Sequence, residues 1–148
     1  MLFRSELALA GVNRITIINR SVQRGEELSE LIRTKTPAQV RFLPWTANIE
    51  IPRDTDILIN GTSIGLFPDV DNRPDIDYDS IHSSMTVCDV ITNDPHTKFL
   101  HEAKCRGAKT IHGLNMMINQ GAINFTLWTG KEAPLDVMTD SITKEFNL

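Results

Sequence analysis

A short apolar segment that leads directly into a helical pattern is the feature that most constrains how this chain can fold. Residues 15–18 read Ile-Thr-Ile-Ile, a mostly β-branched run typical of a buried strand in a parallel sheet. Asn19, Arg20 and Ser21 follow at once, and a helical spacing of apolar residues begins at Val22. Doubly wound sheets bind ligands where strand ends meet helix starts. The segment therefore predicts a strand–helix unit with a binding site at the junction.

The side chains at this junction indicate which ligand it would accept. A dinucleotide fold that reads a plain ribose usually places an acidic residue here, whereas this chain has Arg20, with Arg24 one helical turn later. Two guanidinium groups and the Ser21 hydroxyl suit a 2′-phosphate, because planar guanidinium forks pair well with phosphate oxygens. The pattern favours NADP over NAD as cofactor. The alternative is that Ser21 only caps the helix and that both arginines are solvated.

Along the rest of the chain, apolar segments alternate with helical patterns. The sequence predicts strands at 15–19, 40–43, 56–60, 86–90 and 108–111. It predicts helices at 2–10, 22–34, from Asp94-Pro95 to Gly107 with Asp94 as the N-cap, at 114–129 and from Pro134 onward. Trp128 is expected on the inner face of the helix at 114–129, and the acidic residues of 67–79 are expected in a solvated loop. This alternation predicts an α/β, Rossmann-like, doubly wound and mostly parallel sheet of about five strands in a single domain, 1–148.

Composition argues against several classes of partner and site. The formal net charge is −4 and there is no basic block, so nucleic acids and anionic membranes are not expected as partners. No apolar run is long enough to span a bilayer. Cys88 and Cys105 do not form a C-x-x-C pair, and a reduced, cytoplasmic protein is the simplest expectation. The four histidines are scattered along the chain, and the two on one predicted helix, His96 and His101, are five residues apart and would not share a face, so we expect no metal site.

The glycine-rich loop that normally cradles the cofactor phosphates has no counterpart in the sequence. There is no G-x-G-x-x-G, and the chain begins inside what should be the helix that follows such a loop. The usual first strand has no counterpart either, which predicts a truncated dinucleotide-binding domain. Asp89, at a predicted strand end, could be catalytic. It could equally bond backbone amides of the adjacent loop, which is the commoner role for an acid in that place.

Four segments, in order, resemble those of the shikimate dehydrogenase family. They are Asn19-Arg20-Ser21-x-x-Arg24, residues 60–66 (Asn-Gly-Thr-Ser-Ile-Gly-Leu), residues 89–97 (Asp-Val-Ile-Thr-Asn-Asp-Pro-His-Thr) and residues 113–122 (Gly-Leu-Asn-Met-Met-Ile-Asn-Gln-Gly-Ala). Two segments, Asn60-Gly61-Thr62 and Leu-Trp-Thr-Gly at 127–130, resemble those of the quinate/shikimate branch of the family. The resemblance covers nearly the whole chain but only the C-terminal, NADP-binding half of a family member.

The resemblance implies roles by position. It would place the 2′-phosphate of the cofactor against Arg20, Ser21 and Arg24, and the adenosine side against Asn19, Thr62 and Ser63. The nicotinamide would lie beside Val90, Gly113 and Met116, and a substrate hydroxyl near Gln120. Thr92 stands where the family has a substrate-contacting tyrosine. The implied activity is NADP-dependent reduction of 3-dehydroshikimate to shikimate, in aromatic amino acid biosynthesis, with quinate as the other possible substrate.

The family's catalytic Lys and Asp belong to an N-terminal substrate domain and match no residue here, so no catalytic residue is assigned. Shikimate or quinate would bind if that domain were supplied, and the chain alone is expected to be inactive. In the family's fold the missing strand lies between those at 15–19 and 56–60. Two alternatives stay open: a non-catalytic module that binds a nucleotide or a partner chain, and a degenerate remnant of the enzyme. Association of identical chains is also possible.

Overall fold

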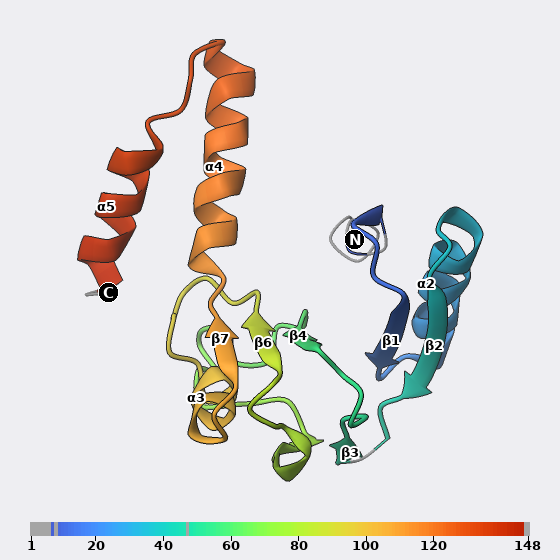
Figure 1. Cartoon of the computed structure of the whole chain (residues 1–148). Helices are drawn as coiled ribbons and strands as arrows, with labels where there is room; N and C mark the ends of the chain where they lie inside the picture. Colours follow the sequence, from blue (N-terminus) through green and yellow to red (C-terminus); the bar gives the residue numbers. More distant parts are fainter. Residues whose placement is uncertain (1–6, 8, 47, 147–148) are drawn as a thin grey trace. The chain divides into compact units, whose positions relative to one another are not determined.

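The computed structural model describes residue 7, residues 9–46 and residues 48–146. The helix predicted at 2–10 lies largely outside these residues. The chain groups into two compact units, Met1–Ile49 and Glu50–Leu148, which we call the N-terminal and C-terminal units (Figure 1). Among the helices of the described residues, none is long and apolar enough to cross a membrane.

The N-terminal unit is a strand–helix–strand motif. Strand β1 (Arg14–Asn19) pairs in parallel with β2 (Gln39–Pro44), and helix α2 (Val22–Lys35) connects them. Its core consists of Ile17, Leu28, Ile32 and Ala38, with Ile15, Val40 and Phe42 packed against them. Gly25 makes room for Phe42, because a Cβ there would lie 2.1 Å from the Phe42 ring and the ring would have to shift. The predicted strand, helix and strand are thus confirmed.

The C-terminal unit is built on a parallel sheet in the order β4-β6-β7. The strands are β4 (Ile57–Asn60), β6 (Thr86–Asp89) and β7 (Lys109–Ile111), and helix α3 (Lys98–Cys105) connects the last two. The central strand is fully covered at Val87, which is 0% exposed. The α/β class with parallel strands is confirmed. The five predicted strands are all present, and they form two parallel groups within the described residues.

The segment at 67–79 is not entirely a loop, although most of its acidic residues are exposed as predicted. It contains β5 (Ile76–Asp77), which pairs with β3 (Ile49–Glu50), and it leads into the 3-10 helix η1 (Tyr78–Ser80). The aromatic ring of Tyr78 is buried against Phe99 of α3, and its hydroxyl donates to the Pro74 carbonyl at 2.9 Å. Burial of this tyrosine is what anchors the segment, and the sequence pattern did not predict it.

Helix α3 begins later than predicted. Asp94 was expected to be its N-cap, but the cap is Thr97, whose Oγ1 accepts from the Leu100 N–H at 3.4 Å. Asp94 instead accepts from the His96 N–H at 2.7 Å in a turn before the helix. Aspartate and threonine are both common N-cap residues, so the sequence does not distinguish between them by type. The proline that follows Asp94 suits the first turn of a helix, and the prediction therefore placed the cap at Asp94.

Helices α4 (Leu114–Thr129) and α5 (Leu135–Phe146) form a hairpin through Gly130, whose φ of +67° favours glycine. No charged residue occurs in α4, and Leu114, Ile118 and Ala122 form its buried face. The expectation that Trp128 lies inside is wrong, because its side chain is 82% exposed. The C-terminal end of α4 extends beyond the sheet, where the nearby element is α5 (Figure 1).

Candidate functional site

The junction of β1 and α2 carries the first group of predicted site residues. Asn19 ends the strand, and its Oδ1 accepts from the Ser21 N–H at 3.0 Å. Ser21 is the N-cap of α2, with its Oγ accepting from the Arg24 N–H at 3.3 Å. The capping role foreseen as the alternative for Ser21 is therefore confirmed.

The two arginines of this junction are exposed at the positive end of the helix. Arg20 precedes the cap and Arg24 lies in the first turn, which contains no acidic residue. Unsatisfied N–H groups and the helix dipole already favour an anion there. Two added guanidinium groups strengthen that preference, so the arrangement fits a phosphate group.

The second group of predicted residues lies in the C-terminal unit, at the carboxyl ends of neighbouring parallel strands. Thr62 and Ser63 follow β4, Val90 and Thr92 follow β6, and Gly113, Met116 and Gln120 follow β7 at the start of α4. Ser63 and Gln120 are exposed and Gly113 is buried, while the others are half-buried. Carboxyl ends of parallel strands are where open α/β sheets bind ligands. The structure thus brings Thr62, Ser63, Val90, Thr92 and Gly113 to one edge of this sheet, with Met116 in the first turn and Gln120 in the second turn of the helix that begins there.

A buried polar network ties this edge together. Asn60 and Asp89 lie opposite each other in the register of β4 and β6, and the Asn60 Nδ2 donates to the Asp89 carboxylate at 3.1 Å. Asp89 also accepts from the Thr97 hydroxyl at 2.7 Å and the Ile91 N–H at 3.2 Å. Burial raises the pKa of the Asp89 carboxyl, and these hydrogen bonds oppose the rise. The backbone-bonding alternative for Asp89 is confirmed, whereas the parts played by Asn60 and Thr97 were not predicted.

Gly113 brings the start of α4 against the segment that follows β6. A Cβ at this position would lie 2.4 Å from the Ile91 carbonyl oxygen and 2.8 Å from the Val90 carbonyl carbon. Both are backbone atoms, so no side-chain rotation can relieve the contact. Only glycine permits this close approach.

Gly113→Ala is therefore expected to destabilise the protein by about 1–3 kcal/mol through overpacking. Gly121→Ala is the matched control in the same helix, because a Cβ there meets only Met138 Cε at 3.8 Å. The control should be neutral or stabilising, since alanine has the higher helix propensity. Urea denaturation of the two variants measures the difference. Equal free energies of unfolding would show that Gly113 is not required for the packing.

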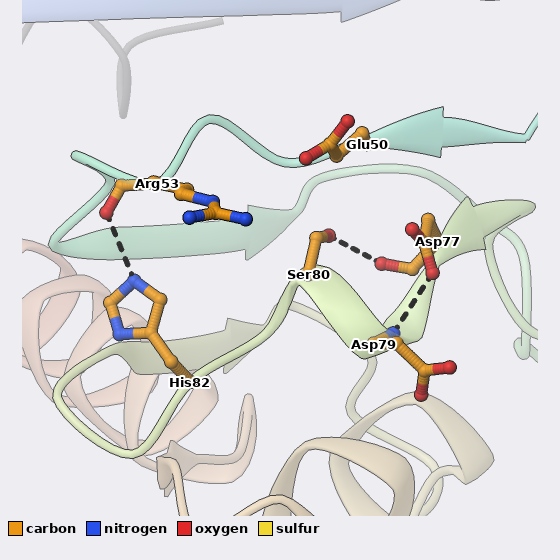
Figure 2. Close-up of a pocket in the computed structure, with 6 residues that line it drawn as sticks. All are labelled: Glu50, Arg53, Asp77, Asp79, Ser80 and His82. Atoms are coloured by element: carbon orange, nitrogen blue, oxygen red, sulfur yellow. Dashed lines mark hydrogen bonds between the residues drawn. The ribbon is translucent and has the colours of Figure 1, made fainter.

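A hollow of about 580 Å³ lies on the segments that lead into β4 and β6, away from the predicted site residues (Figure 2). It is lined by Glu50, Arg53, Asp77, Asp79, Ser80 and His82. The Ser80 Oγ accepts from the Ile51 N–H at 2.9 Å, and the His82 Nε2 donates to the Arg53 carbonyl at 3.1 Å. The side chains of Ser80 and His82 thus join neighbouring segments, which is a structural role.

Comparison with known proteins shows which enzymes this chain resembles. Residues 113–143 match the family model described as the shikimate 5′-dehydrogenase C-terminal domain. The NADP(+) shikimate dehydrogenase of Desulforamulus reducens is 38% identical over 142 residues, which is 95% of this chain and 49% of that enzyme. The chain spans about half the length of the curated relatives it matches.

Solved structures agree over the same extent. Ligand-free 5-ketofructose reductase of Gluconobacter superposes with a TM-score of 0.85 and 41% identity, over 95% of this chain and 50% of that one. A shikimate dehydrogenase in complex with NADP+ superposes with a TM-score of 0.76 and 35% identity, over 96% and 49% of the two chains. By sequence and by fold, the chain is therefore similar to the C-terminal half of shikimate dehydrogenases.

Proposed function

We propose that this chain is the cofactor-binding half of an NADP-dependent shikimate dehydrogenase that reduces 3-dehydroshikimate to shikimate. The observation that carries the proposal is the pair of exposed guanidinium groups, Arg20 and Arg24, at the start of α2. The relatives are NADP(+) enzymes, and a 2′-phosphate is the group that distinguishes NADP from NAD. We further propose that the two units act together as one dinucleotide-binding domain, residues 1–148.

The chain's own residues would bind and orient the cofactor, which supplies the hydride when bound. Arg20 and Arg24 would pair with the 2′-phosphate, with Ser21 beside them. The hydroxyls of Thr62 and Ser63 are suited to the adenosine side. The remaining predicted contacts would face the reacting end, namely Val90, Gly113 and Met116 beside the nicotinamide and the Gln120 amide toward a substrate hydroxyl. Acid–base chemistry on the substrate would come from another domain, because no residue here matches the family's catalytic pair.

A second candidate is reduction of another polyhydroxylated ketone. Thr92 replaces the tyrosine of the family pattern, which shortens or removes one substrate contact. The superposition on 5-ketofructose reductase, at 41% identity, favours the same alternative. This candidate keeps the cofactor assignment and changes only the substrate.

Two chimeras test the two candidates. One joins the half of the Desulforamulus reducens enzyme that this chain does not cover to this chain, and the other uses the corresponding half of the Gluconobacter reductase. Turnover of shikimate with NADP by the first chimera supports the main proposal. Turnover of 5-ketofructose by the second, with none of shikimate or quinate by the first, would favour the alternative. Absence of activity and of NADP binding in both would contradict the cofactor-binding assignment.

In the first chimera, Gln120→Ala is expected to raise KM for shikimate about tenfold and to leave cofactor affinity nearly unchanged. The reason is the loss of one hydrogen bond from an exposed amide to a substrate hydroxyl. Steady-state kinetics with both substrates measures the effect. Asn119→Ala, one position earlier on the same helix and also exposed, is the control. An unchanged KM in Gln120→Ala would make Gln120 an ordinary surface residue.

A further inference from the structure

Asp89 is a buried acid at the carboxyl edge of the sheet, and the proposed function gives it no role. Its side chain is 3% exposed and accepts hydrogen bonds from three neutral groups, on Asn60, Ile91 and Thr97. An ionised carboxylate accepts at every position and donates at none, so it suits a site in which each neighbour presents a hydrogen. Taking a carboxylate out of water is unfavourable, and these hydrogen bonds offset that cost.

Asn60 links Asp89 by hydrogen bonds to the loop that follows β4. Its Nδ2 donates to Asp89 at 3.1 Å and to the Ile64 carbonyl at 3.3 Å. Its Oδ1 accepts from the Thr62 N–H at 3.1 Å and the Thr62 hydroxyl at 2.7 Å. An amide nitrogen only donates and an amide oxygen only accepts, so Asp89 helps to fix which way the amide points. The loop at 61–65 is thus organised around one amide whose orientation depends on Asp89.

The same carboxylate holds the segment that follows β6. Its Oδ1 bonds the Ile91 N–H two residues along the chain, and its Oδ2 bonds Thr97, which caps α3 by accepting from the Leu100 N–H. The Ile91 carbonyl is also the atom against which Gly113 is packed. Two loops and the starts of two helices therefore meet around a single carboxylate.

We propose that Asp89 is a positioning residue that couples the loop at 61–65 to the segment at 90–97. Through it, the groups assigned to the adenosine side and those assigned to the nicotinamide are held as one body. The coupling itself stands on the hydrogen bonds above. Its consequence for the cofactor rests on the proposed function.

Native-state hydrogen exchange on the whole chain, without ligand, tests the coupling. In Asp89→Ala, the amides of Thr62 and Ile64 are expected to exchange about tenfold faster, although they donate to Asn60 Oδ1 and Thr62 Oγ1 and not to Asp89. The amide of Ile32 in α2 should be unchanged. In Asp89→Asn, the remaining side-chain oxygen can still accept from Asn60 and Ile91. This variant should therefore return the Thr62 and Ile64 rates to within about threefold of the wild-type values.

Asp94→Ala is the matched control, because Asp94 lies in the same segment and also accepts a backbone hydrogen bond, from His96. It should speed exchange at His96 and leave Thr62 and Ile64 unchanged. Unchanged rates at Thr62 and Ile64 in Asp89→Ala would overturn the coupling, as would an equal rise in the Asp94 control.

Asn60→Ala serves if Asp89→Ala does not fold, because coupling between two sites is reciprocal. Faster exchange at Ile91 and Leu100 then supports the proposal, and unchanged exchange there overturns it.

The chimera with the Desulforamulus reducens half tests the consequence for the cofactor. A positioning role predicts that Asp89→Ala weakens NADP+ and NADPH by the same factor. A change in the ratio of the two affinities would mean that the carboxylate acts directly on the charge of the ring, and it would overturn the positioning role. Because hydrogen exchange uses no cofactor, failure of the chimera to bind NADP counts against the proposed function and leaves the coupling result standing.

Discussion

The purified chain, assayed alone with NADP and shikimate, is expected to show no turnover, and millimolar NADP is expected to leave its melting temperature unchanged. The phosphate-cradling glycine loop has no counterpart in the sequence, so the strongest anion contact of a dinucleotide fold is missing. Asp89, which directly precedes the predicted nicotinamide contact Val90, is buried and already bonded to three donors. It is therefore not placed to exchange a proton with a substrate hydroxyl.

Absorbance of NADPH at its characteristic wavelength measures turnover, and thermal melts with and without NADP measure binding through the stabilisation that a bound ligand confers. The active first chimera, assayed beside the chain, controls for the quality of the reagents. Turnover by the chain alone would show that its own residues include the catalytic groups, and that it was wrong to assign them to another domain.

Arg20→Ala in the first chimera is expected to weaken NADP binding by roughly 10- to 100-fold, with a much smaller effect on NAD. Hydrogen bonds from a guanidinium to a charged group are worth more than neutral ones, and only NADP carries the 2′-phosphate. Isothermal titration with both cofactors measures the two affinities. High salt should reduce the difference, because Arg20 is exposed and its charge is screened.

Arg41→Ala is the control for Arg20, since it removes the same charge from an exposed position on β2 in the same unit. It should change both affinities little and equally. If Arg20→Ala weakened NAD and NADP to the same extent, the assignment of the 2′-phosphate to this arginine would be wrong.

Local patterns predicted the elements well where one signal dominated. The β-branched run at 15–18 and the helix between Gly113 and Gly130 were placed within a residue of their observed bounds. Prediction failed where two signals competed, as with Asp94 and Thr97 as caps of α3. It also failed for Trp128, because amphipathic spacing says which residues share a face and not whether another element covers it.

The candidate site, like the fold, was predicted in part from the sequence. Each site residue was predicted from its own segment, and the structure puts five of them at the carboxyl edge of one sheet and two in the first two turns of α4. The hydrogen bond between Asn60 and Asp89 was not predictable, because it depends on the register of two strands 29 residues apart in the sequence. The packing of Gly113 on Ile91 likewise follows from the position of α4 on the sheet.

Because Trp128 is exposed, its intrinsic fluorescence can report on the surroundings of α4. This indole is 82% exposed near the end of the uncharged helix α4, whereas the other tryptophan, Trp45, is half-buried in the N-terminal unit. A water-exposed indole fluoresces at longer wavelength than a covered one. Anything that covers the end of α4, whether a second chain or a fused domain, should therefore shift the Trp128 emission to the blue. With Trp45 replaced by Phe, that shift can be followed without a label.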